Sequence, residues 1–263
     1  MPEGHTIHRH ARIHTGDLAG QRLTVSSPQG WASTAAEAAN GKVLTGVDAF
    51  GKHLIYRFED DLSVHVHLGL FGRFRRYKLP GPPPRDTTRL RFTGDTRGVD
   101  LSGAVISDLI DPVEEDELMA RLGPDPLRPY ARADRMRAAL ARRRSPIGAA
   151  LLDQTVLAGL GNVYRAEILF ACGIDPRREA RAVDRAEADA IWKTSKTMLT
   201  AGEKSGKIVT VPRAEAGKPP SKLTGRDRHQ VYKRERCRRC GTRVETATMG
   251  ARTMFWCPAC QPV

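Results

Sequence analysis

The chain has 263 residues, which is enough for two domains with their own hydrophobic cores and a further metal-stabilised segment. Lysines and arginines number 43 against 30 aspartates and glutamates, so the formal net charge is +13, which favours a polyanionic partner. The sequence has no recognisable signal peptide and no apolar run of membrane-spanning length. It therefore argues against a membrane or secreted protein, and we expect a reducing, cytoplasmic environment.

The first residues, Met1-Pro2-Glu3-Gly4-His5, place a carboxylate directly after a proline. Methionine aminopeptidases tolerate a small second residue, so we expect Met1 to be removed and Pro2 to become an N-terminal secondary amine. An α-amino group has a pKa near ~7.7–8.0, so an appreciable fraction is neutral and nucleophilic at cellular pH. Such an amine can form an iminium with a sugar carbon, and Glu3 can transfer protons. The alternative is a protective proline before an acidic residue that suits a helix N-terminus.

The first half of the chain is predicted to be rich in β-structure after one short helix. The helix covers residues 3–15 and ends at Gly16. Short alternating segments bounded by turn residues then predict an all-β sandwich or barrel. These segments are 22–25, 44–47, 53–58, 63–67, 89–92 and 104–107, and Pro82–Pro84 form a stiff surface loop.

From about residue 112 the pattern becomes helical. Helices are predicted over 114–122, 133–143, 146–152, 162–172 and 186–200. The stretch 202–226 is rich in glycine, proline and lysine and is predicted to be a mobile connector. These changes divide the chain into a β-rich domain (1–112), a helical domain (113–225) and a cysteine-containing segment (226–263).

The helical domain contains a glycine-rich turn between two predicted helices. Ser145 is placed to cap a helix with Pro146 at its first position. Gly159 and Gly161 allow a tight turn, and Asn162 falls at the start of the next helix. Helix N-termini bind anions through free backbone amides, so this turn is a candidate phosphate site. The alternative is a helix corner capped by an asparagine.

Four of the five cysteines form two C-x-x-C pairs: Cys237, Cys240, Cys257 and Cys260. Sixteen residues separate the pairs, and this spacing predicts a closed tetrahedral site for one structural zinc ion. Two disulfides are the alternative, which a reducing compartment disfavours. The intervening residues 241–256 alternate as a β-hairpin would. The fifth cysteine, Cys172, is predicted to be a buried thiol at a helix end.

Basic residues gather in three places rather than being spread evenly. The clusters are Arg73, Arg75, Arg76 and Lys78; Arg142–Arg144; and Arg226, Arg228, Lys233, Arg234, Arg236, Arg238 and Arg239. A run of charge is usually a solvated face, but three runs beside a zinc segment favour a nucleic-acid partner. Histidines at 5, 8, 10, 14, 65 and 67 raise a second metal site as an alternative, although no carboxylates accompany them at ligand spacing.

Together these features resemble the formamidopyrimidine-DNA glycosylase/endonuclease VIII family of base-excision repair enzymes, and the resemblance spans the whole chain. It rests on the Pro-Glu-Gly start, the β-rich first half, the Gly-Leu-Gly-Asn turn and the cysteine segment ending in Cys-Pro-Ala-Cys-Gln261. The start Pro-Glu-Gly-His-Thr is similar to the bacterial endonuclease VIII branch. The resemblance implies an α+β multidomain fold. Its parts are an N-terminal β-sandwich with a short N-terminal helix, a helical domain with a helix-two-turn-helix motif, and a C-terminal β-hairpin zinc finger.

The resemblance also implies roles for individual residues. Pro2 would be the nucleophile and Glu3 the acid, and Lys52 would be the family's β-hairpin lysine, which contacts a phosphate and supports the chemistry. Asn162 and Arg252 would hold phosphates on either side of the lesion. A bound base must leave the helical stack, and Leu70 and Phe71, in His67-Leu-Gly-Leu-Phe-Gly72, resemble the family's wedge loop. The alternative for Leu70 and Phe71 is a place in a core strand.

The implied activity is that of a bifunctional DNA glycosylase and AP lyase. It would remove oxidised bases, pyrimidines such as thymine glycol foremost, and cleave the strand by β,δ-elimination through a proline Schiff base. The rivals are a glycosylase for oxidised purines (8-oxoguanine, formamidopyrimidine) and a non-catalytic zinc protein that binds damaged DNA. The expected partner is damaged double-stranded DNA, with bubble and single-stranded DNA left open. We expect a monomer in the bacterial cytoplasm, associated with the nucleoid through DNA.

Two stretches depart from the family pattern. The approach to the first zinc cysteine, residues 232–237, is shorter than usual, which puts the docking angle of the zinc finger in doubt. Residues 202–226 do not align with the family. In the formamidopyrimidine branch the corresponding region recognises the base. The sequence therefore leaves undetermined which base the substrate pocket accepts.

Overall fold

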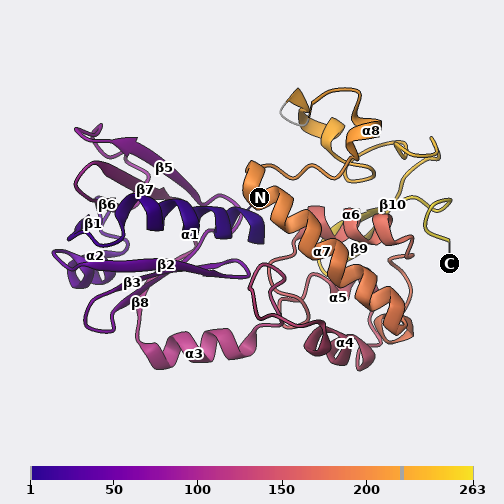
Figure 1. Cartoon of the computed structure of the whole chain (residues 1–263), viewed down its shortest axis with the longest axis horizontal. Coiled ribbons are helices and arrows are strands. Elements are labelled where there is room, and N and C mark those ends of the chain that lie inside the picture. The colour runs from indigo at the N-terminus through magenta and orange to yellow at the C-terminus, as the bar shows by residue number, and fades with distance from the viewer. Residues whose placement is uncertain (1, 220–221, 263) are drawn as a thin grey trace. The chain divides into compact units, whose positions relative to one another are not determined.

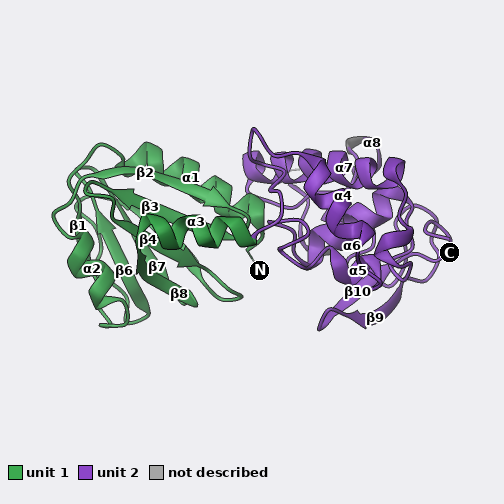
Figure 2. Ribbon diagram, turned by 90° about the horizontal axis from the view of Figure 1, so that it is seen from below, with its two compact units in different colours: residues 1–121 green, residues 122–263 purple. Residues whose placement is uncertain are grey.

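The computed structural model describes residues 2–219 and 222–262, which form two compact units, 1–121 and 122–263 (Figure 2). The predicted division of the second stretch into a helical domain and a zinc finger stays a prediction. None of the described helices combines the length and apolar character that a membrane crossing requires.

Unit 1 is a β-sandwich of two antiparallel four-stranded sheets, ordered β1-β6-β7-β5 and β2-β3-β4-β8, with three helices (Figure 1). Its elements are α1 (Gly4–Leu18), β1 (Thr24–Ser26), α2 (Ser33–Ala39), β2 (Leu44–Phe50), β3 (His53–Phe58), β4 (Ser63–His67), β5 (Arg73–Lys78), β6 (Thr88–Thr93), β7 (Arg97–Ser102), β8 (Ile106–Ile110) and α3 (Pro112–Arg121). Helix α1 contacts β2, β3 and β7. The predicted N-terminal helix and sandwich are therefore confirmed.

The core of unit 1 follows the period of two that a strand imposes on its side chains. Along β3, Leu54, Tyr56 and Phe58 enter the core that both sheets share, whereas His53 and Arg57 lie on the opposite face. This alternation is why the predicted bounds of β3 and β4 match the structure.

Several predictions for unit 1 were wrong in detail. Helix α1 continues through Gly16 to Leu18, because Leu18 is fully buried and extends the packed face by another turn. The predicted strands 22–25 and 104–107 lie about two residues later. Strands β5 and β7 and helix α2 were not predicted. Strand β5 is an edge strand that pairs only with β7, and its mostly exposed basic residues carry no burial pattern.

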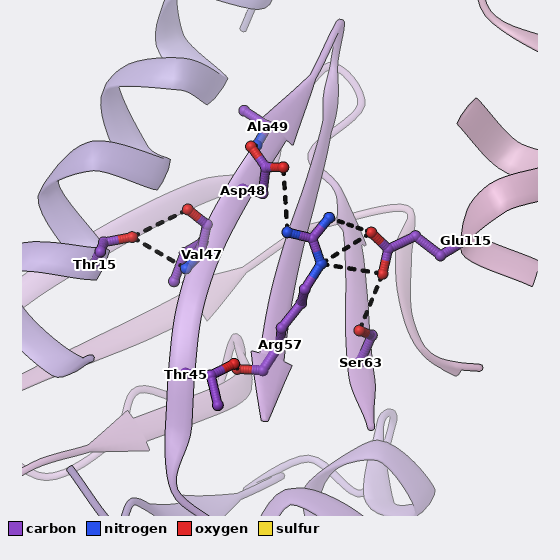
Figure 3. A network of polar contacts seen from close by, with 8 residues as sticks. All are labelled: Thr15, Thr45, Val47, Asp48, Ala49, Arg57, Ser63 and Glu115. Atoms are coloured by element: carbon purple, nitrogen blue, oxygen red, sulfur yellow. Dashed lines mark hydrogen bonds and ion pairs between the residues drawn. The ribbon is translucent and has the colours of Figure 1, made fainter. Parts of the chain in front are cut away.

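An ion-pair network holds α3 on the outer face of the sheet β2-β3-β4-β8 (Figure 3). The Arg57 guanidinium donates three hydrogen bonds to the Glu115 carboxylate, from Nε to Oε1 at 3.0 Å and Oε2 at 3.4 Å, and from Nη2 to Oε1. Its Nη1 donates to Asp48 at 3.2 Å, and the Ser63 hydroxyl donates to Glu115 at 3.2 Å. Glu115 is 8% exposed, so its charge depends on these partners.

We expect Glu115→Gln to lower the free energy of unfolding by about 1–2 kcal/mol, because the guanidinium loses a charge-assisted hydrogen bond. Urea denaturation at neutral pH measures the change. The matched control is Asp116→Asn on the next, exposed residue of α3. Equal stabilities for the two variants would contradict the importance of this network.

Unit 1 also buries uncharged histidines. The Nδ1 atom of His14 lies 2.6 Å from the Tyr56 hydroxyl, and both side chains are fully buried. Burial lowers the pKa of His14 well below its ordinary value. It also lowers the pKa of His10 to about 4 and that of His53 to about 3. These imidazoles stay neutral in the fold, whereas the unfolded chain binds protons near pH 6.5.

We therefore expect stability to fall as pH drops below 6.5. There the unfolded state binds more protons than the folded state, so each neutral histidine costs up to about 1.4 kcal/mol per pH unit until its folded pKa is reached. Above pH 6.5 the effect vanishes. His14→Gln should make the slope of unfolding free energy between pH 6.5 and 5 shallower by about this amount, as measured by urea titrations. A slope unchanged by the substitution would contradict the prediction.

Unit 2 contains most of the helices and one hairpin (Figure 1). Its elements are α4 (Ala133–Ala141), α5 (Ile147–Ala150), α6 (Asn162–Cys172), η1 (Ala180–Ala182), α7 (Arg185–Ser205), α8 (Arg213–Ala216), η3 (Gly225–Arg228), β9 (Glu245–Met249) and β10 (Arg252–Trp256). Helix α6 begins and ends as predicted, and the hairpin β9–β10 confirms the predicted hairpin between the cysteine pairs. Helix α6 is almost wholly buried and contacts α5, α7 and β10.

Two local details of unit 2 correct the sequence interpretation. Pro146 is the N-cap of α5 rather than its first residue, because its extended backbone (ψ 141°) pairs with Glu179. Cys172 lies at the end of α6 as predicted but is only half-buried, and burial raises the pKa of its thiol.

The predicted connector 202–226 is partly helical. Helix α7 extends to Ser205, and both α8 and part of η3 fall within the connector. A small apolar cluster of Val211, Ala216 and Leu223 explains this order. Residues 220 and 221 of the connector lie outside the described residues.

Candidate active site and zinc centre

The N-terminal pair lies at the start of α1. Glu3 is the N-cap of this helix and is fully buried, and its backbone carbonyl accepts a hydrogen bond from the Thr6 N–H at 2.8 Å. Pro2 precedes it and is half-buried. The positive end of the helix dipole stabilises a carboxylate at this position. A buried carboxylate therefore lies directly beside the residue whose backbone nitrogen is the predicted nucleophile.

Lys52 lies in the two-residue turn of the β2–β3 hairpin. Phe50 and His53 are paired across the hairpin, and Gly51 has a φ of 59°. A tight hairpin turn needs a positive φ at its first central residue, which glycine adopts without strain. Because α1 lies along β2, the start of α1 and this turn lie at the same end of unit 1 (Figure 1).

Three histidines cluster on the strands next to Lys52. His53 Nδ1 lies 2.9 Å from His65 Nε2, and the ring centroids of His53 and His67 are 5.0 Å apart. Desolvation by burial lowers the pKa of His65 to about 4 and also lowers that of His67. The cluster is therefore neutral at cellular pH and leaves the local positive charge to lysine.

Leu70 and Phe71 lie in the loop between β4 and β5 and not in a core strand. They are 42% and 83% exposed. The loop is tight because the Gly72 N–H donates to the Leu68 carbonyl at 2.9 Å, and a Cβ on Gly72 would lie 2.2 Å from that oxygen. Glycine is therefore required here, and the loop presents two apolar side chains to solvent.

In unit 2, Asn162 is the first residue of α6, and its side-chain amide donates to the Thr253 carbonyl at 3.0 Å. Arg252 begins β10, and its side chain is exposed. The structure thus connects these two predicted residues, 90 positions apart in sequence, through the hairpin backbone.

Two charged residues of α6 were missed by the sequence interpretation. Arg165 is fully buried beneath the hairpin, and its Nε donates to Asn162 Oδ1 at 3.0 Å. The buried Glu167 carboxylate accepts from the backbone N–H groups of Gln230, Val231 and Tyr232, at 2.8, 2.9 and 2.8 Å. The spacing of Arg165 three residues after Asn162, on one helix face, was the available signal.

The four cysteine sulfurs lie within 4.8 Å of one another. The Sγ–Sγ distances are 3.5 Å for Cys240–Cys257, 3.5 Å for Cys240–Cys260 and 3.9 Å for Cys237–Cys260. A tetrahedral zinc with Zn–S bonds of about 2.3 Å requires sulfurs about 3.8 Å apart, whereas a disulfide requires about 2.05 Å. The geometry fits one structural zinc and not two disulfides.

The cysteine turns are also tied to α6. Gln261 accepts a hydrogen bond from the Cys257 N–H at 3.0 Å and donates to the Ile174 carbonyl at 2.8 Å. Through Gln261, the zinc centre is attached to the residues that follow α6.

Three family models match the chain. They describe the formamidopyrimidine-DNA glycosylase N-terminal domain (residues 1–104), the formamidopyrimidine-DNA glycosylase H2TH domain (122–212) and the zinc finger found in FPG and IleRS (234–263). The chain is 44% identical to "Endonuclease 8 1" of Mycobacterium tuberculosis over 267 residues, covering 99% of this chain and 100% of that protein. It is 34% identical to "Formamidopyrimidine-DNA glycosylase" of Laribacter hongkongensis, covering 99% and 98%.

Solved structures share the fold. Fpg from Lactococcus lactis, in a complex with DNA containing an abasic site, matches with a TM-score of 0.81 at 24% identity, over 99% of this chain and 100% of that chain. From these matches, the chain belongs to the formamidopyrimidine-DNA glycosylase/endonuclease VIII family. It is a DNA glycosylase with AP lyase activity, and its zinc finger is of the type this family carries. The predicted family, fold class, enzyme class and structural zinc are confirmed.

Proposed function

We propose that this enzyme removes oxidised bases, pyrimidines foremost, from damaged double-stranded DNA and then cleaves the strand through a covalent Pro2 intermediate. The observation that carries the proposal is the fully buried Glu3 at the N-cap of α1, directly after Pro2. The 44% identity to a protein named Endonuclease 8 1 supports the endonuclease VIII branch and hence the preference for pyrimidines.

In this mechanism the Pro2 amine, freed of Met1, attacks C1′ of the damaged nucleotide. The bond from C1′ to the base breaks, and the base leaves with the electron pair and takes up a proton. Glu3 assists by protonating the sugar ring oxygen, which opens the ring and leaves an iminium between Pro2 and C1′. Loss of a C2′ proton then expels the 3′ phosphate, a second elimination expels the 5′ phosphate, and water releases Pro2.

Lys52, Asn162 and Arg252 would bind backbone phosphates in this complex. Lys52 lies at the tip of a hairpin beside histidines that burial keeps neutral. The positive charge at this tip is therefore that of the lysine. Asn162 begins α6, and the positive end of a helix dipole favours an anion at this position. Together they would hold the phosphates while the damaged nucleotide is extruded.

Leu70 and Phe71 would fill the space left by the extruded base. Unstacking a base costs a few kcal/mol, which an inserted apolar side chain offsets. Phe71 exposes 83% of its surface on a loop fixed by glycine, so its burial in DNA would remove apolar area from water. A location at the bacterial nucleoid follows from this DNA-binding role.

Borohydride trapping on duplexes that carry thymine glycol, 8-oxoguanine or a plain abasic site tests the proposal. Reduction of the iminium should leave a stable adduct that maps to Pro2. We expect adducts with thymine glycol and the abasic site, and a slower reaction with 8-oxoguanine.

Three other outcomes would contradict the proposal. No adduct from protein with bound zinc and Met1 removed would favour a non-catalytic damage-binding protein. Faster trapping on 8-oxoguanine would favour the oxidised-purine alternative, and full lyase activity of Pro2→Gly would contradict the Pro2 mechanism.

A further inference from the structure

Among the residues that the structure describes, Arg165 has the largest fully buried side chain, and it lies on α6 in unit 2. A buried guanidinium costs several kcal/mol unless its N–H groups are hydrogen-bonded. Here Nε donates to Asn162 Oδ1 at 3.0 Å, and Nη1 donates to the carbonyls of Gly148 at 2.6 Å and Met249 at 2.9 Å. Nη2 donates to the carbonyl of Arg252 at 3.1 Å. The Arg165 guanidinium thus connects α5, α6 and the β9–β10 hairpin.

The acceptors on the hairpin are the two residues that flank its turn. Met249 and Arg252 are paired, and Gly250 and Ala251 between them have φ values of 59° and 56°. Positive φ at both central residues is the mark of a two-residue type I′ hairpin turn. By binding both flanking carbonyls, Arg165 fixes the position of this turn relative to α6 and leaves the Arg252 side chain exposed.

The same guanidinium fixes the amide of Asn162. Oδ1 accepts from Arg165, and Nδ2 donates to the Thr253 carbonyl at 3.0 Å. These two bonds determine which end of the amide is oxygen and which is nitrogen. The second N–H of Nδ2 then has a fixed direction at the N-terminus of α6.

We propose that Arg165 is a positioning residue that aligns Asn162 and Arg252 as one phosphate-binding unit, although it touches no DNA itself. This inference rests on the proposed function, in which these two side chains bind phosphates beside the lesion. Two side chains on different segments bind one ligand well only if the segments already have the right relative position before the ligand binds. Arg165 maintains that position because it contacts both segments directly.

The test uses the full chain with bound zinc and a duplex that carries a tetrahydrofuran abasic analogue. Arg165→Lys keeps the charge but cannot reach four acceptors from one plane, and Arg165→Met fills the space without donors. We expect either change to weaken binding about 10–100-fold. The slope of log affinity against log salt should become shallower by about one, because Arg252, the charged member of the pair, no longer neutralises a phosphate.

A double-mutant cycle separates positioning from a merely structural role. In a background carrying Asn162→Ala and Arg252→Ala, Arg165→Lys should weaken binding by less than about 3-fold, because the residues it positions are gone. A structural role would give the same loss in both backgrounds and an unchanged salt slope. The matched control is Arg178→Lys, which disturbs the ion pair with Glu187 elsewhere in unit 2 and should leave the salt slope unchanged.

The outcomes distinguish this inference from the proposed function. If the unmodified protein forms no trapped adduct, the proposed function is wrong. If it forms the adduct but the effects of the substitutions at Arg165 and at Asn162 and Arg252 are additive, only the Arg165 inference is wrong. Loss of zinc or of a cooperative unfolding transition in both Arg165 variants would assign this residue to folding and would also overturn the inference.

Discussion

Glu3→Gln is expected to slow base excision by about 10²–10⁴-fold, the range that a positioned acid or base contributes. The substitution keeps the shape of the side chain, which is fully buried at the N-cap of α1, but removes its ability to donate a proton. Single-turnover excision of thymine glycol from a duplex measures the effect. The melting temperature of the variant should change little, since the amide can occupy the same space.

The control for Glu3 is Glu117→Gln, an exposed carboxylate on α3. It should excise at the rate of the unmodified enzyme. If Glu3→Gln also kept that rate, the acid would have to be another group, and the proposed roles of Pro2 and Glu3 would need revision.

Cys240→Ser is expected to abolish zinc binding and to weaken DNA binding about 100-fold, which corresponds to about 2.8 kcal/mol. Binding of a structural zinc contributes about 10–16 kcal/mol in zinc-finger peptides, and most of this free energy is folding free energy. Without the metal, the two cysteine pairs at the ends of the β9–β10 hairpin are no longer held together, and Arg252 loses its defined position. Zinc content by mass spectrometry and affinity for an abasic-analogue duplex are the measurements.

Cys172→Ser provides the matched control, because this thiol is half-buried at the end of α6 and lies outside the zinc cluster. It should retain one zinc and full affinity. A Cys240→Ser protein that kept both its zinc and its affinity would contradict the four-thiolate assignment.

Local signals explain why much of the fold was predictable. The bounds of β3, β4 and α6 match the prediction, since each carries its own periodic pattern and clear turn or cap residues. The cysteine spacing predicted the zinc centre because C-x-x-C turns place sulfurs around a metal with little help from the rest of the chain. Gly69 and Gly72 indicated a loop at Leu70 and Phe71, which is also a local signal. Only glycine fits at position 72, where the backbone lies close to Leu68.

What the sequence left open depends on partners that are distant along the chain. Strand β5 is exposed and basic, and only its pairing with β7 makes it a strand. Arg165 could equally have been a solvated or phosphate-binding arginine, because Asn162 is its one acceptor that lies nearby in the sequence and the other three are distant.

The sequence alone determined the family and the four zinc cysteines, and it predicted the Pro2-Glu3 pair, because short motifs carry that chemistry. The tertiary structure decided how Asn162 and Arg252 are linked. The carbonyls that receive the Arg165 guanidinium lie 17, 84 and 87 positions away, and only folding brings them together. A buried charge is tolerated only where such acceptors converge, and that convergence is a property of the packed fold.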